Sequence, residues 1–310
     1  MDGHSVIKRY LYPKERFQKA KEALPPLVQI INKSYGEYSL QLRENYFNIY
    51  YQGNSLAKVI LNKNGTYSAE IHKEFLQLDS PYKILNKLEQ YSKKNTRKNS
   101  DYICFSRIKS EDFHRFFQKD HLKRLSARIQ AVNNGEEITF EQILITDNPP
   151  SENFIIIDRQ VADHKSRAQI DLLALKRDSA HKPFHFLIIE EKMGRNPELK
   201  DKVGEQLNCF INHVRKYIGD YADCYERNYQ QKKELGLFDP FDTRLPDKIE
   251  IDRNENTVEG LIVVGGYSQR AEKVLRENLY PKIKKNWPNI KVQQMRNEIK
   301  LDNRSYCEEP

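Results

Sequence analysis

The stretch AQIDLLALKRDSAHKPFHFLIIEEKMGR, residues 168–195, contains two apolar runs that both carry charged residues. Apolar runs of this length, separated by a polar segment, predict two strands that are buried on both faces. Asp171 lies within the first run, and Glu190, Glu191 and Lys192 end the second. Because an unpaired charge is costly to bury, these residues must be compensated by one another or by a ligand.

The elements around this stretch predict a mixed α/β domain. Apolar periodicity and capping residues predict helices and strands that alternate along the chain. Asn196 and Pro197 provide the clearest helix start, as a cap followed by a proline in the first turn. The expected order is a helix over 110–132, a short helix within 136–150, strands over 153–161, 168–177 and 184–193, a helix over 198–218, a strand over 258–267, a helix over 269–287 and a strand near 290–295.

The first hundred residues have a different pattern. A helical stretch over 13–35 is interrupted by consecutive prolines, and short alternating runs over 38–75 with the turn signals QGN and NKNG predict an antiparallel meander. The basic, aperiodic segment 91–102 is expected to be a linker or an exposed loop. The sequence therefore predicts two domains, a small β-rich domain over 1–100 and an α/β domain over 101–310.

The net charge of +8 comes entirely from the N-terminal domain. Residues 1–100 contain 17 Lys and Arg against 9 Asp and Glu, whereas residues 101–310 contain 35 of each class. Such an excess favours a polyanion such as DNA as a partner, although a solvated lysine-rich surface explains it equally well. Ten of the 18 tyrosines also lie in this domain, where they stack on bases or, in the simpler interpretation, pack a half-buried sheet.

The composition also excludes several classes of protein. No apolar run reaches the roughly 18 residues that a membrane helix needs, and the N-terminus lacks the apolar segment of a signal peptide. The four cysteines are scattered, which argues against a zinc site or a disulfide framework. We therefore expect a cytoplasmic protein with reduced thiols and no membrane partner.

Strand geometry places the charged residues of the opening stretch together. Side chains alternate between faces, so Glu190 and Lys192 point the same way and Glu191 points opposite, where we expect it to be replaceable. If the two strands are neighbours, Asp171 lies beside Glu190, and a divalent cation relieves the repulsion between the two carboxylates. Asp171, Glu190 and the backbone carbonyl of Glu191 are the oxygen ligands expected to hold Mg²⁺, with Mn²⁺ as a substitute. Lys192 would orient or deprotonate a water molecule, or stabilise a charged transition state.

This arrangement resembles the signature of the PD-(D/E)XK nucleases, in which an acid on one strand is followed by acid-x-lysine on the next. Asp171 and Glu190-x-Lys192 match that pattern, with Ile170 where the family name has proline. The resemblance extends over about residues 130–300 in the order of elements. It implies a restriction-endonuclease-like core, a mixed sheet flanked by helices, and metal-dependent hydrolysis of phosphodiester bonds.

Two further features of the resemblance concern the flanking helices. Gln206 and Phe210 are similar to the glutamine-x-x-x-tyrosine motif of the RecB-like branch, with phenylalanine replacing the tyrosine. Many family members add an acid from the helix before the first strand, and Glu137 and Glu141 lie one helical turn apart in the corresponding segment. Glu137 is slightly favoured over Glu141 as a member of the catalytic site.

The expected function is cleavage of DNA by an endonuclease of a restriction or phage-defence type. Cutting both strands of a duplex favours a homodimer or a larger homo-oligomer, and a partner ATPase or sensor protein remains open. Arg159 and Gln160, at the end of the first strand, are candidates to contact DNA, whereas Asp158 with Arg167 or Arg159 could equally form a plain ion pair. The alternatives are a non-catalytic or partner-activated nucleic-acid-binding subunit with the same fold and, third, an RNA nuclease.

Overall fold

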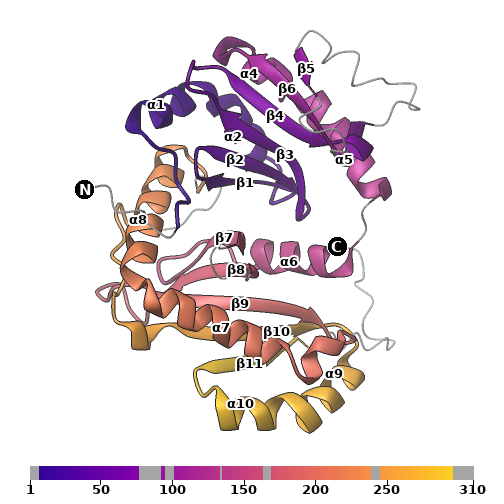
Figure 1. The fold of residues 1–310 in the computed structure, drawn as a ribbon, viewed down its shortest axis with the longest axis vertical. Helices are drawn as coiled ribbons and strands as arrows, with labels where there is room; N and C mark the ends of the chain where they lie inside the picture. The colour runs from indigo at the N-terminus through magenta and orange to yellow at the C-terminus, as the bar shows by residue number, and fades with distance from the viewer. Residues whose placement is uncertain are drawn as a thin grey trace, which may run out of the picture.

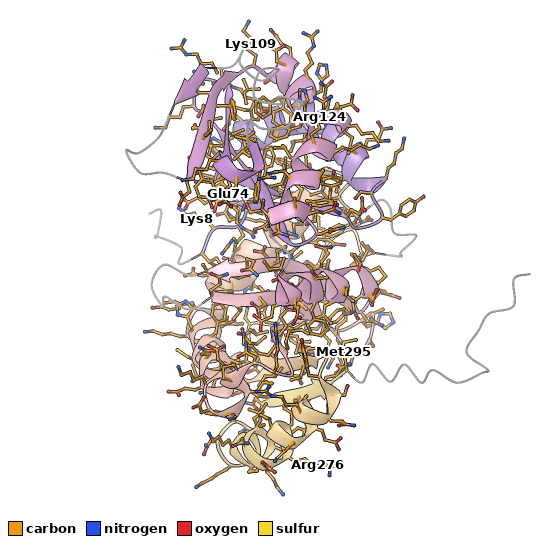
Figure 2. The ribbon with its side chains drawn as sticks, turned by 90° about the vertical axis from the view of Figure 1, so that its right-hand side faces the viewer. Lys8, Glu74, Lys109, Arg124, Arg276 and Met295 are labelled. Atoms are coloured by element: carbon orange, nitrogen blue, oxygen red, sulfur yellow. The ribbon has the colours of Figure 1, made fainter. Side chains whose placement is uncertain are left out.

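The protein is a mixed α/β structure with two β-sheets stacked along its longest axis (Figure 1). Figure 2, turned by 90°, places Lys109 and Arg124 toward one end of the molecule and Arg276 at the opposite end. The expected α/β class is confirmed. The computed structural model describes residues 7–76, 92–94, 101–132, 135–162, 169–238 and 245–295.

The first sheet contains six antiparallel strands in the order β1-β2-β3-β4-β6-β5. Gln52 and Gly53 connect β2 to β3 and both have positive φ angles, 43° and 83°, which match a tight hairpin turn. The predicted meander is thus confirmed. The strands are β1 (Tyr38–Arg43), β2 (Tyr46–Tyr51), β3 (Asn54–Leu61), β4 (Tyr67–His72), β5 (Ser92–Lys94) and β6 (Tyr102–Ile108).

The described residues of the first unit also contain four helices and a 3₁₀ turn. The predicted break at the prolines is confirmed, because one helix ends at Ala23 and the next begins at Pro25. Apolar side chains from these helices and from the sheet form one core that continues to Ile129. The elements are α1 (Lys14–Ala23), α2 (Pro25–Asn32), η1 (Lys73–Leu76), α4 (Ser110–Phe116) and α5 (Lys119–Val132).

The boundary predicted at residue 100 falls within this first unit. β6 pairs with β4 in the middle of the sheet, and Phe113 and Phe117 pack against residues of the meander. The predicted linker at 91–102 falls mostly outside the described residues, and its described part forms β5 and the start of β6. The chain passes to the second unit only after α5, which ends at Val132.

The second sheet contains five strands in the order β11-β10-β9-β8-β7. β7, β8 and β9 are antiparallel neighbours, whereas β9, β10 and β11 are parallel, so the sheet is mixed, as the sequence predicts. The strands are β7 (Phe154–Ala162), β8 (Gln169–Lys176), β9 (His185–Met193), β10 (Glu259–Gly265) and β11 (Ile290–Gln294).

Helices cover both faces of this sheet. Phe140 and Leu144 of α6 pack on one face with Leu187 and Ile189, whereas Leu207 and other apolar residues of α7 pack on the other with β8, β9 and β10. The order of the predicted helices and strands is confirmed. The elements are α6 (Glu136–Asp147), η2 (Pro197–Lys200), α7 (Val203–Lys216), α8 (Ile218–Glu234), η3 (Glu255–Thr257), α9 (Ser268–Val274), a π-helical turn η4 (Leu275–Leu279) and α10 (Tyr280–Asn286).

Helix α8, which the sequence analysis did not predict, links the two units (Figure 1). Tyr221 and Tyr225 near its start lie in the core of the second sheet, and Leu235 just after its end lies in the core of the first. Gln231 exchanges two hydrogen bonds with the backbone of Leu11, at 2.8 and 2.9 Å. The helix therefore fixes how the two sheets are placed.

A buried charge cluster lies where the units meet. The Asp158 carboxylate on β7 accepts hydrogen bonds from Arg43 Nη1 at 2.5 Å and from the Tyr225 hydroxyl at 3.0 Å. Arg9 Nε lies 3.8 Å from the same carboxylate. Lys232 Nζ donates nearby to Gln41 Oε1 at 2.6 Å and to a carbonyl of β7. Asp158 therefore forms an ion pair, but with Arg43 and Arg9 and not with Arg159, whereas Arg167 lies outside the described residues.

The pKa values follow from this crowding. Burial disfavours the charged form of Asp158, but Arg43, Arg9 and Lys232 outweigh burial, so the pKa of Asp158 is lowered. For Lys232 burial dominates and lowers its pKa to about 8. The Asp158 carboxylate is thus the counter-charge of Arg43, Arg9 and Lys232.

Removing this carboxylate should destabilise the fold. We expect Asp158→Asn to lower the free energy of unfolding by about 3–5 kcal/mol, because it leaves buried cations without a counter-charge. Urea denaturation followed by circular dichroism measures the change. Asp178→Asn is the matched control, since Asp178 is exposed and its ion pair among the described residues is with Lys182 at 3.5 Å, and should shift the value by less than about 0.5 kcal/mol. Equal effects of the two substitutions would contradict the role given to Asp158.

Candidate active site

The charged residues of the opening stretch meet at one end of the second sheet. The register pairs Leu172 of β8 with Ile189 of β9, so the preceding residue Asp171 lies beside the following residue Glu190. Glu190, Glu191 and Lys192 are 6%, 3% and 8% exposed, and Asp171 is half-buried. The predicted proximity of the two acids follows from this register.

Lys192 is the centre of the cluster. Its Nζ lies 2.7 Å from Glu190 Oε1, 4.0 Å from Asp171 Oδ2 and 3.7 Å from Glu198 Oε2. Asp171 Oδ2 also accepts a hydrogen bond from the Glu191 backbone N–H at 2.9 Å, so part of its hydrogen-bonding capacity is already used. One ammonium group therefore faces three carboxylates in a mostly buried position.

The excess of carboxylates perturbs the pKa values. Burial and the neighbouring Asp171 raise the pKa of Glu190 to about 7, and burial raises the pKa of Asp171 above its usual value. Burial disfavours the Lys192 ammonium, but Glu190 and Asp171 outweigh it and raise the pKa of Lys192. Perturbed acids next to a charged partner are typical of functional sites.

Glu191 lies on the opposite face, as predicted, but it is not an exposed position. Its side chain is buried, and its carboxylate oxygen Oε2 has no hydrogen-bond partner among the described residues. Burial, Asp171 and Glu141 raise its pKa to about 10, so Glu191 is protonated at neutral pH. Glu191 is therefore not the replaceable position that the sequence analysis expects. Substitution of a buried acid with an unpaired oxygen changes the free energy of unfolding.

The two candidate acids on α6 have different environments. Glu137 is exposed and accepts a hydrogen bond from Asn196 Nδ2 at 2.7 Å, while its charge contributes to the raised pKa of Asp171. Glu141 is buried, and Arg159 Nε donates to its Oε1 at 2.6 Å. Glu137 is therefore the acid that can reach a ligand without first breaking a buried ion pair.

Neither residue of the helix motif contacts this cluster among the described residues. Gln206 is exposed on the second turn of α7, and no contact among the described residues links its side chain to Asp171, Glu190 or Lys192. Phe210, one turn later, is fully buried in the core of the second sheet. The role of Gln206 stays a prediction.

Arg159 is not available to contact DNA, whereas the expected DNA contact of the partly buried Gln160 stays a prediction. Arg159 is fully buried, where it binds Glu141, Gln142 Oε1 at 2.9 Å and the ring face of Tyr50 at 4.8 Å. Gln160 donates to Glu141 Oε2. The sequence analysis missed this because the burial of Arg159 depends on α6 and on the first sheet, both distant in sequence.

Glu198 and Asn196 are members of the site that the sequence analysis missed, since it assigned Asn196 only to helix capping and gave Glu198 no role. Asn196 does cap, since its side chain accepts from the Glu198 backbone N–H at 2.9 Å, but it caps η2, and α7 begins later at Val203. This extra turn brings Glu198 to Lys192. The only signal in the sequence was the position of both residues shortly after the acid-x-lysine pattern.

The site fits a hard cation only through a pair of carboxylates. Asp171 and Glu190 offer oxygen ligands whose raised pKa values fall when a cation binds, and Mg²⁺ often takes one or two carboxylates together with water and substrate oxygens. Within the described residues no group of three or more His, Cys, Asp or Glu side chains has the arrangement of a metal site. A substrate phosphate would have to complete the ligand shell.

The protonated state of Glu191 predicts a pH effect on stability. Between its unfolded pKa of 4.5 and its folded pKa of about 10, the folded state holds a proton that the unfolded state has lost, so the free energy of unfolding falls as pH rises. Glu191→Gln should therefore raise it by about 1–3 kcal/mol near pH 8 and by less near pH 5. Urea denaturation at both pH values measures this, with the exposed Glu255→Gln as control. A destabilised Glu191→Gln at pH 8 would refute the assignment.

The described residues contain no helix with the length and apolarity needed to cross a bilayer. No family model, curated protein or solved structure matches this chain.

Proposed function

We propose that the protein is a metal-dependent endonuclease that hydrolyses phosphodiester bonds in DNA, with a restriction-endonuclease-like core of the PD-(D/E)XK type. The observation that carries the proposal is the position of Lys192, whose ammonium group lies among Glu190, Asp171 and Glu198 at the end of two neighbouring strands. Acids with raised pKa values around a buried lysine suit reactions in which negative charge develops.

Asp171 and Glu190 would hold the metal ion, with the carbonyl of Glu191 as a third ligand. Mg²⁺ or Mn²⁺ would supply an activated water molecule and stabilise charge on the phosphate. Lys192 keeps its proton, because its pKa is raised. It is therefore suited to stabilise the negative charge of the pentacoordinate transition state at phosphorus and less suited to act as a base. Glu137 is exposed beside the cluster and could contact a ligand there.

The substrate, the assembly and the biological role of this nuclease are proposed from the charge balance and from the resemblance. The basic balance of residues 1–100 favours DNA as the substrate. Tyr50 and Tyr51, however, are buried and pack within the first unit, so they do not present stacking surfaces. A role in restriction or phage defence, a homodimer or larger homo-oligomer, and a partner ATPase or sensor protein stay proposals that follow from the resemblance.

One observation favours a second candidate, a non-catalytic or partner-activated nucleic-acid-binding subunit. The ammonium of Lys192 already neutralises Glu190 at 2.7 Å, and the described residues offer only two carboxylates as a metal-binding set. In this interpretation a partner or a nucleic acid must rearrange the cluster before cleavage. An RNA nuclease is a third candidate, and competition between DNA and RNA separates it from the first.

The decisive experiment compares cleavage of supercoiled plasmid by the wild type and by Lys192→Met with Mg²⁺, Mn²⁺ or EDTA. We expect cleavage that requires the metal and falls at least about 100-fold in the variant, because the transition-state charge loses its stabilising ammonium. Lys176→Met is the matched control, since Lys176 is at the other end of β8 and its ion pair within the described part of the chain is with Glu259.

Folding of each variant is checked by circular dichroism, and DNA binding by fluorescence anisotropy. A folded wild type that binds DNA but cleaves nothing with any metal supports the subunit interpretation. Equal cleavage by Lys192→Met and Lys176→Met contradicts a catalytic site at Lys192.

A further inference from the structure

The ammonium group of Lys192 lies beside both acids that are proposed to hold the metal ion. Its Nζ is 2.7 Å from Glu190 Oε1 and 4.0 Å from Asp171 Oδ2. The side chains of Lys192, Glu190 and Asp171 are only 10%, 8% and 21% exposed, so water screens their charges weakly. The ammonium group is therefore the counter-charge of the two carboxylates in this arrangement.

The two carboxylates cannot keep this ammonium group and also bind a divalent cation. A cation held by Glu190 and Asp171 would lie close to Lys192 Nζ, and like charges repel strongly in a site that is largely closed to water. Glu190 Oε1 would also have to exchange the hydrogen bond from Nζ for a bond to the metal ion. Lys192 and the cation therefore compete for one pair of acids.

Glu198 offers the ammonium group of Lys192 a second position. Its Oε2 lies 3.7 Å from Lys192 Nζ, its side chain is 36% exposed, and its ion pair within the described part of the chain is with Lys192. The backbone of Glu198 is fixed, because its N–H donates to the side chain of Asn196 at 2.9 Å, whereas its carboxylate takes no part in this cap. The flexible four-carbon stem of a lysine allows Nζ to turn from Glu190 toward Glu198 without a change in the backbone of β9.

We propose that Lys192 is the counter-ion of the Asp171–Glu190 pair, that it must leave Glu190 before the pair can hold a divalent cation, and that Glu198 receives it. Glu198 is then a positioning residue that acts through Lys192. The inference rests on the metal site of the proposed function, and it adds that the free protein binds the metal ion more weakly than the two acids alone would. Lys192→Met should therefore strengthen metal binding, although the same substitution removes cleavage.

The test measures Mn²⁺ binding by the full-length protein at neutral pH without nucleic acid, from the electron paramagnetic resonance signal of free Mn²⁺. We expect Lys192→Met to bind Mn²⁺ about tenfold more tightly than the wild type, because the competing ammonium group is removed. Lys176→Met is the control for the loss of a positive charge, since Lys176 is at the other end of β8, and should change the affinity by less than about twofold. Circular dichroism checks that each variant is folded.

A double-mutant cycle distinguishes the role of Glu198 from that of a metal ligand or a purely structural residue. Glu198→Gln should weaken Mn²⁺ binding about fivefold when Lys192 is present, because the displaced ammonium group loses its acceptor. In the Lys192→Met background the same substitution should change the affinity by less than about twofold. A residue that binds the metal ion directly, or that only maintains the fold, would weaken binding to the same extent in both backgrounds.

The results for Lys192, for Glu198 and for the nuclease activity are independent of one another. If Lys192→Met binds Mn²⁺ no more tightly than the wild type, or if neither protein binds it, the competition between Lys192 and the cation is overturned. Equal effects of Glu198→Gln in both backgrounds overturn the role of Glu198. Cleavage of supercoiled plasmid by the wild type decides separately whether the protein is a nuclease.

Discussion

The buried carboxylate of Asp158 is the constraint on which the arrangement of the two sheets depends. Arg43 bonds both to this carboxylate and, at 2.7 Å, to the Arg159 carbonyl, so it fixes β1 against β7 in one register. A purely apolar interface could slide, whereas directional bonds to a buried charge permit one placement. Tyr225 bonds to the same carboxylate from α8, so three elements that are distant in sequence converge on a single residue.

The residue after Asp158 connects this interface to the candidate site. A β-bulge in β7 between Ile156 and Asp158 accompanies a change in the direction of the side chains, so that Asp158 contacts Tyr225 while Arg159 contacts Glu141 on α6. Arg159 also lies over the Tyr50 ring of the first sheet. Glu141, the buried acid of α6, is thereby tied through Arg159 to the unit that does not contain the carboxylate cluster.

The sequence predicts those parts of the molecule whose signals are local. Apolar runs identify β8 and β9, and strand alternation brings Asp171, Glu190 and Lys192 together. The extent of the six-stranded sheet could not be predicted from the sequence, because β6 pairs with β4 over a long distance along the chain and this pairing leaves no local pattern. Helix α8 was missed because polar residues separate its buried tyrosines, and the burial of Arg159 depends on partners from two other elements.

The path of the chain makes the two units depend on each other for a complete core. Ile7 packs in the core of the second sheet, Leu11 packs in the core of the first, and α8 returns from the second core to the first near Leu235. Each unit thus completes its interior with a segment that belongs, in chain order, to the other. Cutting the chain between the sheets yields two incomplete cores, so neither unit can be transferred to another protein as an independent module.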